Sequence, residues 1–143
     1  MKAQPRTARR KAREVAFQLA YQADVMAEGL DADWRAREDQ AALAADPAEL
    51  VDDLLKVLRG RAAEVDALIQ GAARNWEMDR LAATDRSVLR VATAELLGRP
   101  GTPVRVVIDE AIEIARRFGG DESARFVNGV LDQVARTLRP GEV

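Results

Sequence analysis

Residues 103–118 read PVRVVIDEAIEIARRF, and this stretch decides the fold class. Its apolar side chains recur every three or four residues from Val104 to Phe118, with charged residues between them. This spacing is the 3.6-residue period of an amphipathic α-helix and not the two-residue period of a strand. Thr102 and Pro103 precede the run as helix cap and first helical residue, and two glycines follow it. The stretch therefore predicts one α-helix with a single stripe facing the core.

The rest of the chain shows the same pattern. Alanine and leucine dominate, and the five prolines and nine glycines stand where helices start or stop. We expect helices at residues 8–27, 32–45, 46–73, 85–97, 103–118 and 122–138, with Gly60 as a kink in the third. The connecting loops are short and no long repeat occurs. The sequence thus predicts an all-α fold, a compact bundle of about six or seven helices and not a solenoid.

Local signals mark the expected helix ends. Asp46, Pro47 and Glu49 form a capping-box arrangement at the start of the long third helix. Thr84 is the candidate cap of the helix at 85–97, and Gly29 is the expected stop of the first helix. We divide the single expected domain, residues 1–143, into a basic N-terminal arm (1–7), a helical body (8–138) and a short tail (139–143).

Composition excludes most enzyme chemistry. The 143 residues are 48% hydrophobic and 32% charged, as in a soluble globular domain, and no apolar run approaches the roughly 20 residues of a membrane-spanning helix. The chain has no cysteine and no histidine, which removes disulfides, thiolate nucleophiles, imidazole bases and the usual zinc ligands. No secretory signal is recognisable. We expect a cytoplasmic protein that is not an enzyme and uses no metal or cofactor.

The net charge of −2 conceals a strong polarity along the chain. Residues 1–13 contain six basic residues and no acidic one, whereas the remaining residues hold 16 basic and 24 acidic side chains. A basic block opposed to an acidic body indicates a polyanionic partner at one end. The acidic stretch 31–55 is expected to be a solvated face and only secondarily a docking surface.

The first helix carries two distinct faces at 100° per residue. One is the expected core stripe, formed by Ala12, Val15, Ala16, Leu19, Ala23 and Met26. The other places Arg9, Arg10, Arg13, Phe17 and Tyr21 on a flank facing away from the core. Exposed aromatic rings beside guanidinium groups suit unstacked bases and phosphates, which favours single-stranded RNA as the ligand.

A simpler interpretation remains open for two of the aromatic residues. Phe17 and Tyr21 could cover a neighbouring helix while the arginines are merely solvated. Trp34 and Trp76 are expected to be core anchors, because large aromatic side chains usually contribute buried area.

Three stretches of the chain resemble one protein family. They are residues 9–21 (RRKAREVAFQLAY), residues 85–97 (DRSVLRVATAELL) and residues 107–132 (VIDEAIEIARRFGGDESARFVNGVLD). Together they are similar, in order and spacing, to the NusB family of transcription antitermination factors. The resemblance extends over nearly the whole chain and is loose only at residues 29–60.

The resemblance implies an all-helical fold in two packed halves and no enzymatic activity. It implies binding to the boxA element of ribosomal RNA leader transcripts, together with NusE, a small-subunit ribosomal protein, within the antitermination complex of RNA polymerase. Together with the basic flank, it gives these expected RNA contacts: Lys2, Arg6, Arg9, Arg10, Lys11, Arg13, Phe17, Gln18, Tyr21, Arg125, Phe126 and Asn128. The expected NusE contacts are Tyr21, Asp79, Asp85 and Glu122.

Two other functions are weighed against this one. The first is the related RNA-binding domain of certain ribosomal RNA cytosine methyltransferases, which the chain length disfavours because no methyltransferase domain follows Val143. The second is a helical protein-interaction module whose basic N-terminus is incidental. The resemblance leaves both a monomer and a homodimer open.

Overall fold

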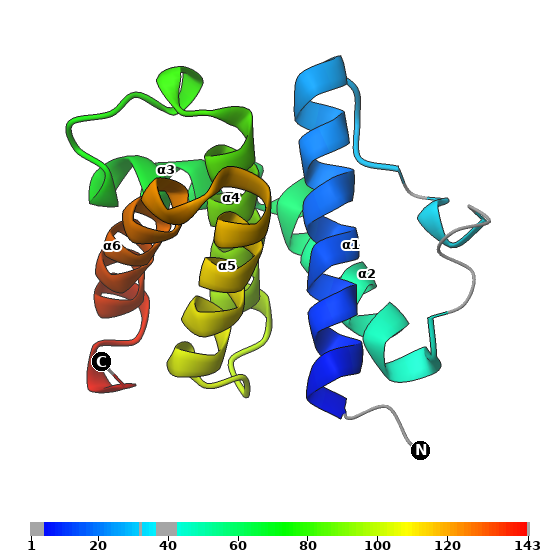
Figure 1. The fold of residues 1–143 in the computed structure, drawn as a ribbon. Coiled ribbons are helices and arrows are strands. Elements are labelled where there is room, and N and C mark those ends of the chain that lie inside the picture. Colours follow the sequence, from blue (N-terminus) through cyan, green and yellow to red (C-terminus); the bar gives the residue numbers. More distant parts are fainter. Residues whose placement is uncertain (1–4, 32, 37–42, 143) are drawn as a thin grey trace.

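The computed structural model describes residues 5–31, 33–36 and 43–142, and helices dominate this part of the chain (Figure 1). The six α-helices are α1 (Pro5–Met26), α2 (Ala45–Gly60), α3 (Ala62–Ala72), α4 (Ala83–Gly98), α5 (Val104–Gly119) and α6 (Asp121–Leu138). Three short 3-10 helices are η1 (Trp34–Ala36), η2 (Met78–Arg80) and η3 (Pro140–Glu142). The described residues contain no strand, and the predicted all-α fold is confirmed.

Helix α4 is the centre of the bundle. It packs against α1 and α2 on one side and against α3, α5 and α6 on the other, as Figure 1 shows. Residues 87–96 of α4, apart from Arg90, are all buried. A helix buried on nearly every face must be surrounded by others, which is why the two groups of helices share one connected core.

The predicted helix boundaries agree with the structure to within three residues at five of the six elements. The kink expected at Gly60 is a complete break, because α2 ends there and α3 begins at Ala62. The break separates two helices that pack differently: α2 lies along α1 and α4, whereas α3 packs on α4 and α6. The helix at 103–118 begins one residue late, with Pro103 as its N-cap.

The predicted side-chain caps are wrong. Helix α2 starts at Ala45 with no side-chain cap, and Asp46 instead binds Arg9 of α1. Helix α4 starts at Ala83, so Thr84 lies inside its first turn. The first helix ends at Met26, before Gly29, and the next residue, Ala27, adopts the left-handed conformation with φ of 54°. At the start of α2 a tertiary contact thus takes the side chain that the local signal assigned to the cap.

The expected acidic helix at 32–45 is not an α-helix where the chain is described. Trp34–Ala36 form a 3-10 turn, residues 43 and 44 are irregular, and residues 37–42 lie outside the described part of the chain. Trp34 is a core anchor, as predicted, and its indole Nε1 donates a hydrogen bond of 2.8 Å to Asp52 of α2. This bond joins the 3-10 turn to α2.

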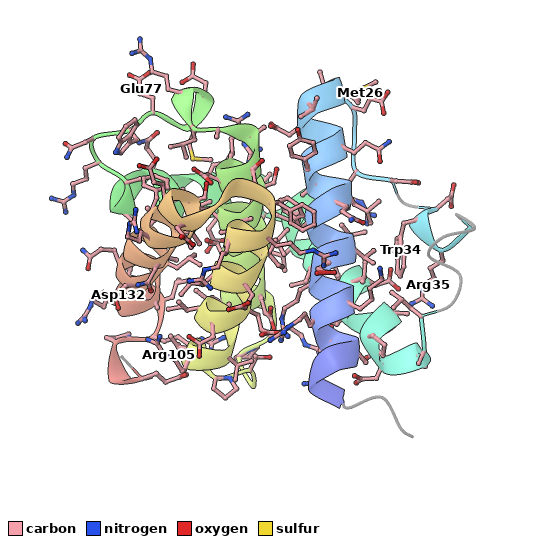
Figure 2. The ribbon with its side chains drawn as sticks, viewed as in Figure 1. Met26, Trp34, Arg35, Glu77, Arg105 and Asp132 are labelled. Carbon is pink, nitrogen blue, oxygen red and sulfur yellow. The ribbon has the colours of Figure 1, made fainter. Side chains whose placement is uncertain are left out.

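The core stripe predicted for the first helix is confirmed over its first half. Ala12, Val15, Ala16 and Leu19 are buried, but Met26 is exposed because α1 extends beyond the helices that cover it (Figure 2). Phe118, predicted to be in the stripe of the helix at 103–118, is also exposed. None of the described helices is both long and apolar enough to cross a membrane.

Candidate nucleic-acid interface

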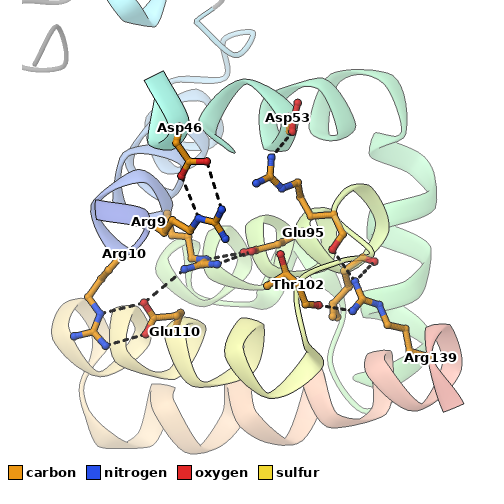
Figure 3. A network of polar contacts seen from close by, with 11 residues as sticks. Arg9, Arg10, Asp46, Asp53, Glu95, Thr102, Glu110 and Arg139 are labelled. Carbon is orange, nitrogen blue, oxygen red and sulfur yellow. Dashed lines mark hydrogen bonds and ion pairs between the residues drawn. The ribbon is translucent and has the colours of Figure 1, made fainter. Parts of the chain in front are cut away.

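The basic side chains that the structure describes on α1 differ in their surroundings, and Figure 3 shows Arg9 and Arg10 with their acidic partners. Lys11 is exposed. The Arg9 guanidinium donates to both carboxylate oxygens of Asp46 at 3.2 and 3.4 Å, and these hydrogen bonds hold the pKa of Asp46 below its ordinary value. The Arg10 guanidinium donates to both oxygens of Glu110 in α5 at 3.1 and 2.8 Å, while its side chain stays 43% exposed.

Arg13 is not part of the surface, and the prediction that it lies on a flank facing away from the core is wrong. Its side chain is only 4% exposed and donates to both oxygens of Glu95 in α4 at 2.8 and 2.7 Å. Its Nη1 also lies 3.7 Å from Glu110. A buried carboxylate requires a cation partner, so Arg13 neutralises the interior of the bundle and is not available to a phosphate.

Phe17 is likewise buried, at 4% exposure, and the prediction that its ring is exposed on the flank of the helix is wrong. Its ring packs 5.0 Å from Phe118 of α5 and 6.1 Å from Tyr21, measured between ring centroids. Phe17 and Arg13 fall on the side of α1 that α4 and α5 cover. The alternative interpretation, that Phe17 covers a neighbouring helix, is the one that holds.

The exposed aromatic surface is therefore formed by Tyr21 and Phe118, with Phe17 beneath them. Tyr21 is 39% exposed, and the guanidinium of Arg117 lies over the ring of Phe118 at 5.2 Å. Arg117 also pairs with Glu14 of α1. Rings supported from below and flanked by cations can stack on bases without first being ordered.

The exposed side of α1 runs from Arg10 through Tyr21 and Gln18 to Lys11. At 100° per residue these four side chains span about 100° of the helix surface. Lys11, Gln18 and Tyr21 are exposed, and the Arg10 side chain is 43% exposed. We call this set, Arg10, Lys11, Gln18 and Tyr21, the α1 face. It combines two cations, an amide and an aromatic ring, which are the groups that bind single-stranded nucleic acid.

A second surface lies beside the junction of α5 and α6. A cleft of about 290 Å³ is lined by Trp76, Asp85, Glu122 and Phe126, among others. The Trp76 and Phe126 rings meet edge to face with centroids 6.0 Å apart. One carboxylate oxygen of Asp85 is buried without a hydrogen-bond partner. The cleft is thus aromatic, with two carboxylates against the single cation Arg80, and this balance suits a basic protein segment better than a phosphate backbone.

The structure places the other predicted contacts as follows. Asp79 lies in η2, next to Arg80, which lines the cleft. Arg125 and Asn128 are exposed on α6. Because Phe126 and Asn128 are two residues apart, they project about 200° apart around the helix, and the fold does not bring them together. Lys2 lies outside the described residues, and for Arg6 the structure describes only its place in α1.

Sequence reasoning missed Trp76 and Phe118. Trp76 was expected in the core but is 54% exposed. The sequence does contain a signal for this exposure. Trp76 lies between Asn75 and Glu77 in a stretch without helical periodicity, where no helix face could bury it. Phe118 precedes the glycine pair that ends α5, and Gly120 has φ of 92°. The glycine turn joins α5 directly to α6, so Phe118 lies at the very end of its helix.

Asp24 and Arg86 connect the two surfaces. The Arg86 guanidinium donates to Asp24 of α1 at 2.7 and 3.2 Å and to the carbonyl oxygens of Met78 and Leu81 at 2.8 and 2.9 Å. Arg90 also donates to Asp24, at 3.1 Å. Burial by itself raises the pKa of the Asp24 carboxyl, but the hydrogen bonds and charges of Arg86 and Arg90 outweigh it and lower the pKa.

Comparison with known proteins gives a consistent result. The NusB family model matches residues 10–136. The chain is similar to the transcription antitermination protein NusB of Koribacter versatilis (strain Ellin345), with 46% identity over 91% of this chain and 90% of the relative. The corresponding protein of Myxococcus xanthus (strain DK1622) is 39% identical over 92% of this chain and 96% of the relative.

Solved structures agree with the sequence relatives. T. maritima NusB superposes with a TM-score of 0.82 at 34% identity, covering 95% of this chain and 93% of the other. A NusB chain in a crystal structure of the antitermination factors NusB and NusE with dsRNA has a TM-score of 0.76 at 26% identity, covering 91% and 97%.

Proposed function

The chain belongs to the NusB family, and from this premise we propose that it binds boxA-type RNA of ribosomal RNA leader transcripts together with NusE. It does so as a transcription antitermination factor in the cytoplasm and works by binding, without a catalytic step. The observation that carries the proposal is the α1 face, where Arg10 and Lys11 stand beside Tyr21 on one exposed side of the helix.

The RNA contacts proposed are those that the fold leaves accessible. They are Arg9, Arg10, Lys11, Gln18 and Tyr21 on α1, with Arg125, Phe126 and Asn128 on α6. Arg13 and Phe17 support this surface from beneath. Single-stranded RNA fits best, because the Tyr21 and Phe118 rings offer stacking area that a closed duplex does not use.

NusE is proposed to bind at the aromatic and acidic cleft, through Asp79, Asp85 and Glu122, with Tyr21 at its border with the RNA. NusE is a ribosomal protein, and such proteins are basic because they bind RNA. The cleft adds Trp76 to the predicted contacts, since a half-exposed indole resting on Phe126 is a preformed anchor for a partner.

Filter binding over a salt series tests the RNA half of the proposal. Wild-type protein should bind boxA-type RNA more tightly than a scrambled RNA, with affinity falling as salt rises. Arg10→Ala should weaken binding and make the slope of log K against log salt shallower by about 0.7, the value for one phosphate contact on a single strand. Arg136→Ala, which removes an exposed cation from α6, is the matched control and should leave the slope unchanged.

The NusE half is tested by titration with purified NusE. Asp85→Asn and Glu122→Gln should each weaken NusE binding, whereas Glu113→Gln, an exposed carboxylate on α5 away from the cleft, should not. Equal affinities for all three variants would place NusE elsewhere on the molecule.

A further inference from the structure

Glu110 is a fully buried carboxylate that binds an arginine at the surface. It lies in α5, and both of its oxygens accept hydrogen bonds from Arg10 of α1, at 3.1 and 2.8 Å. The Arg10 side chain is nevertheless 43% exposed. The pair therefore connects the interior of the bundle to the α1 face, as Figure 3 shows.

The bonds to Glu110 use one edge of the Arg10 guanidinium. They engage Nε and Nη2, whereas the Nη1 group carries two further N–H donors. Because the fork is planar and rigid, fixing the Nε–Nη2 edge also fixes the direction of the Nη1 donors. Glu110 thus anchors one edge of the Arg10 guanidinium and leaves the other edge for a ligand. This arrangement orders the cation before the ligand binds.

Arg10 and Arg13 each bind a different carboxylate through two hydrogen bonds. Arg13 has its own two-bond partner in Glu95, and its closest approach to Glu110 is 3.7 Å. Arg9 provides the contrast, because its partner Asp46 is 61% exposed and is not held by surrounding side chains in the same way. Adjacent arginines on α1 thus differ in how firmly they are oriented.

We propose that Glu110 is a positioning residue for RNA binding, which holds the Arg10 guanidinium in the orientation that a phosphate or base of the RNA meets. This inference rests on the proposed RNA-binding function. Ordering a long, flexible side chain opposes binding, and a contact that orders it beforehand removes that cost. Glu110 makes no contact with RNA itself in this proposal.

The direction in which one substitution changes RNA affinity distinguishes a positioning role of Glu110 from an effect of its charge. Glu110→Gln removes a negative charge near the RNA, so if charge alone mattered, RNA binding would become tighter. If Glu110 positions Arg10, the variant should bind boxA-type RNA about three- to tenfold more weakly at constant salt. In an Arg10→Ala background the same substitution should have no further effect, because Glu110 acts through Arg10.

Glu95→Gln is the matched control. It removes a buried carboxylate from the same group of side chains without touching Arg10, and it should lower the melting temperature by a similar amount while leaving RNA affinity within about twofold. Arg10→Lys covers the case in which Glu110→Gln does not fold. It keeps the charge and leaves Glu110 in place, but lysine cannot make the two-bond fork, so RNA binding should weaken by several-fold.

Several results would overturn the inference. The first is RNA binding by Glu110→Gln that is unchanged or tighter, and the second is an equal loss of RNA affinity when Glu110→Gln is added to Arg10→Ala. The others are an equal loss of RNA affinity in Glu95→Gln and wild-type RNA affinity in Arg10→Lys. A wild-type protein that does not prefer boxA-type over scrambled RNA would instead refute the proposed function, so the two failures are distinguishable.

Discussion

Arg10 and Arg13 lie one turn apart on α1 and have opposite surroundings. Arg10 reaches solvent, whereas Arg13 is enclosed between Glu95 and Glu110. Both belong to a basic stretch that looks uniform in the sequence. Their different exposure follows from their positions around the helix. A step of three residues rotates a side chain by about 300°, which here moves it from the edge of the exposed surface into the core.

Loss of Arg13 should destabilise the fold. Arg13→Ala leaves two buried carboxylates with insufficient positive charge, so the free energy of unfolding should fall by about 3–5 kcal/mol. Urea denaturation measures the change. Arg136→Ala, which breaks an exposed i,i+4 pair with Asp132, should cost only about 0.3–0.5 kcal/mol. Similar losses for the two variants would show that Arg13 is not the partner of the buried carboxylates.

The pairing of α1 with α2 restrains Arg9. Asp46 occupies the guanidinium that a phosphate would otherwise bind. Because exposed ion pairs are weak, Asp46→Asn should tighten RNA binding by no more than about fivefold, with Arg9 as the group responsible. Glu49→Gln removes a charge from the same helix without freeing Arg9. RNA titration at low salt should show a gain for the first variant that clearly exceeds the second.

Helices α2 and α4 approach closely at Gly98. A Cβ placed on Gly98 would lie 2.6 Å from Cγ2 of Val57, which is buried and β-branched and therefore cannot easily turn away. Gly98→Ala should reduce the free energy of unfolding by about 1–3 kcal/mol. Adding Val57→Ala should recover part of this loss.

Gly129 provides the comparison for Gly98. It lies on the exposed side of α6, and a Cβ there meets nothing within 4 Å. Gly129→Ala should therefore stabilise the protein by about 0.4–1 kcal/mol through helix propensity. Thermal unfolding of both alanine variants would show opposite shifts. A stabilised Gly98→Ala protein would mean that α2 and α4 can separate at no cost.

At the scale of elements, the sequence was a good guide to where helices lie and a poor guide to how they begin. The periods of residues 103–118 and 122–138 predicted α5 and α6 almost to the residue, because an amphipathic stripe depends only on local spacing. The caps at Asp46 and Thr84 failed, because their side chains had other contacts or lay inside the first turn. A side chain that could cap a helix can instead bind any other partner that the fold brings near it.

At the scale of the whole molecule, a cluster of charged side chains connects α1, α3 and α4. Asp24 of α1 accepts hydrogen bonds from Arg86 and Arg90 of α4, and Arg90 also binds Asp66 of α3 at 2.9 and 3.0 Å. Arg86 in addition holds the backbone at Met78 and Leu81, just before α4. This cluster keeps the helix that carries the α1 face aligned with the loop that borders the cleft.

The lowered pKa of Asp24 predicts a pH dependence of stability. A carboxyl whose pKa is lower in the folded than in the unfolded state stabilises the fold at pH values above its ordinary pKa, about 4. That contribution is lost as the pH falls through the lower, folded-state pKa. Urea unfolding should show Asp24→Asn to be less stable than wild type at pH 5, with a difference that shrinks toward pH 2. A difference independent of pH would exclude this role for Asp24.

The sequence by itself determined the all-α fold, the positions of the long helices, the family and the presence of a basic and aromatic first helix, because each depends on residues close together along the chain. Only the tertiary structure decided which of those side chains stay accessible. Arg13 meets Glu95 from 82 residues away, and Arg10 meets Glu110 from 100 residues away. Local periodicity indicates which residues share a face of a helix, but burial depends on what packs against each face. Here α4 and α5 cover Arg13 and Phe17 and leave Arg10 and Tyr21 at the surface.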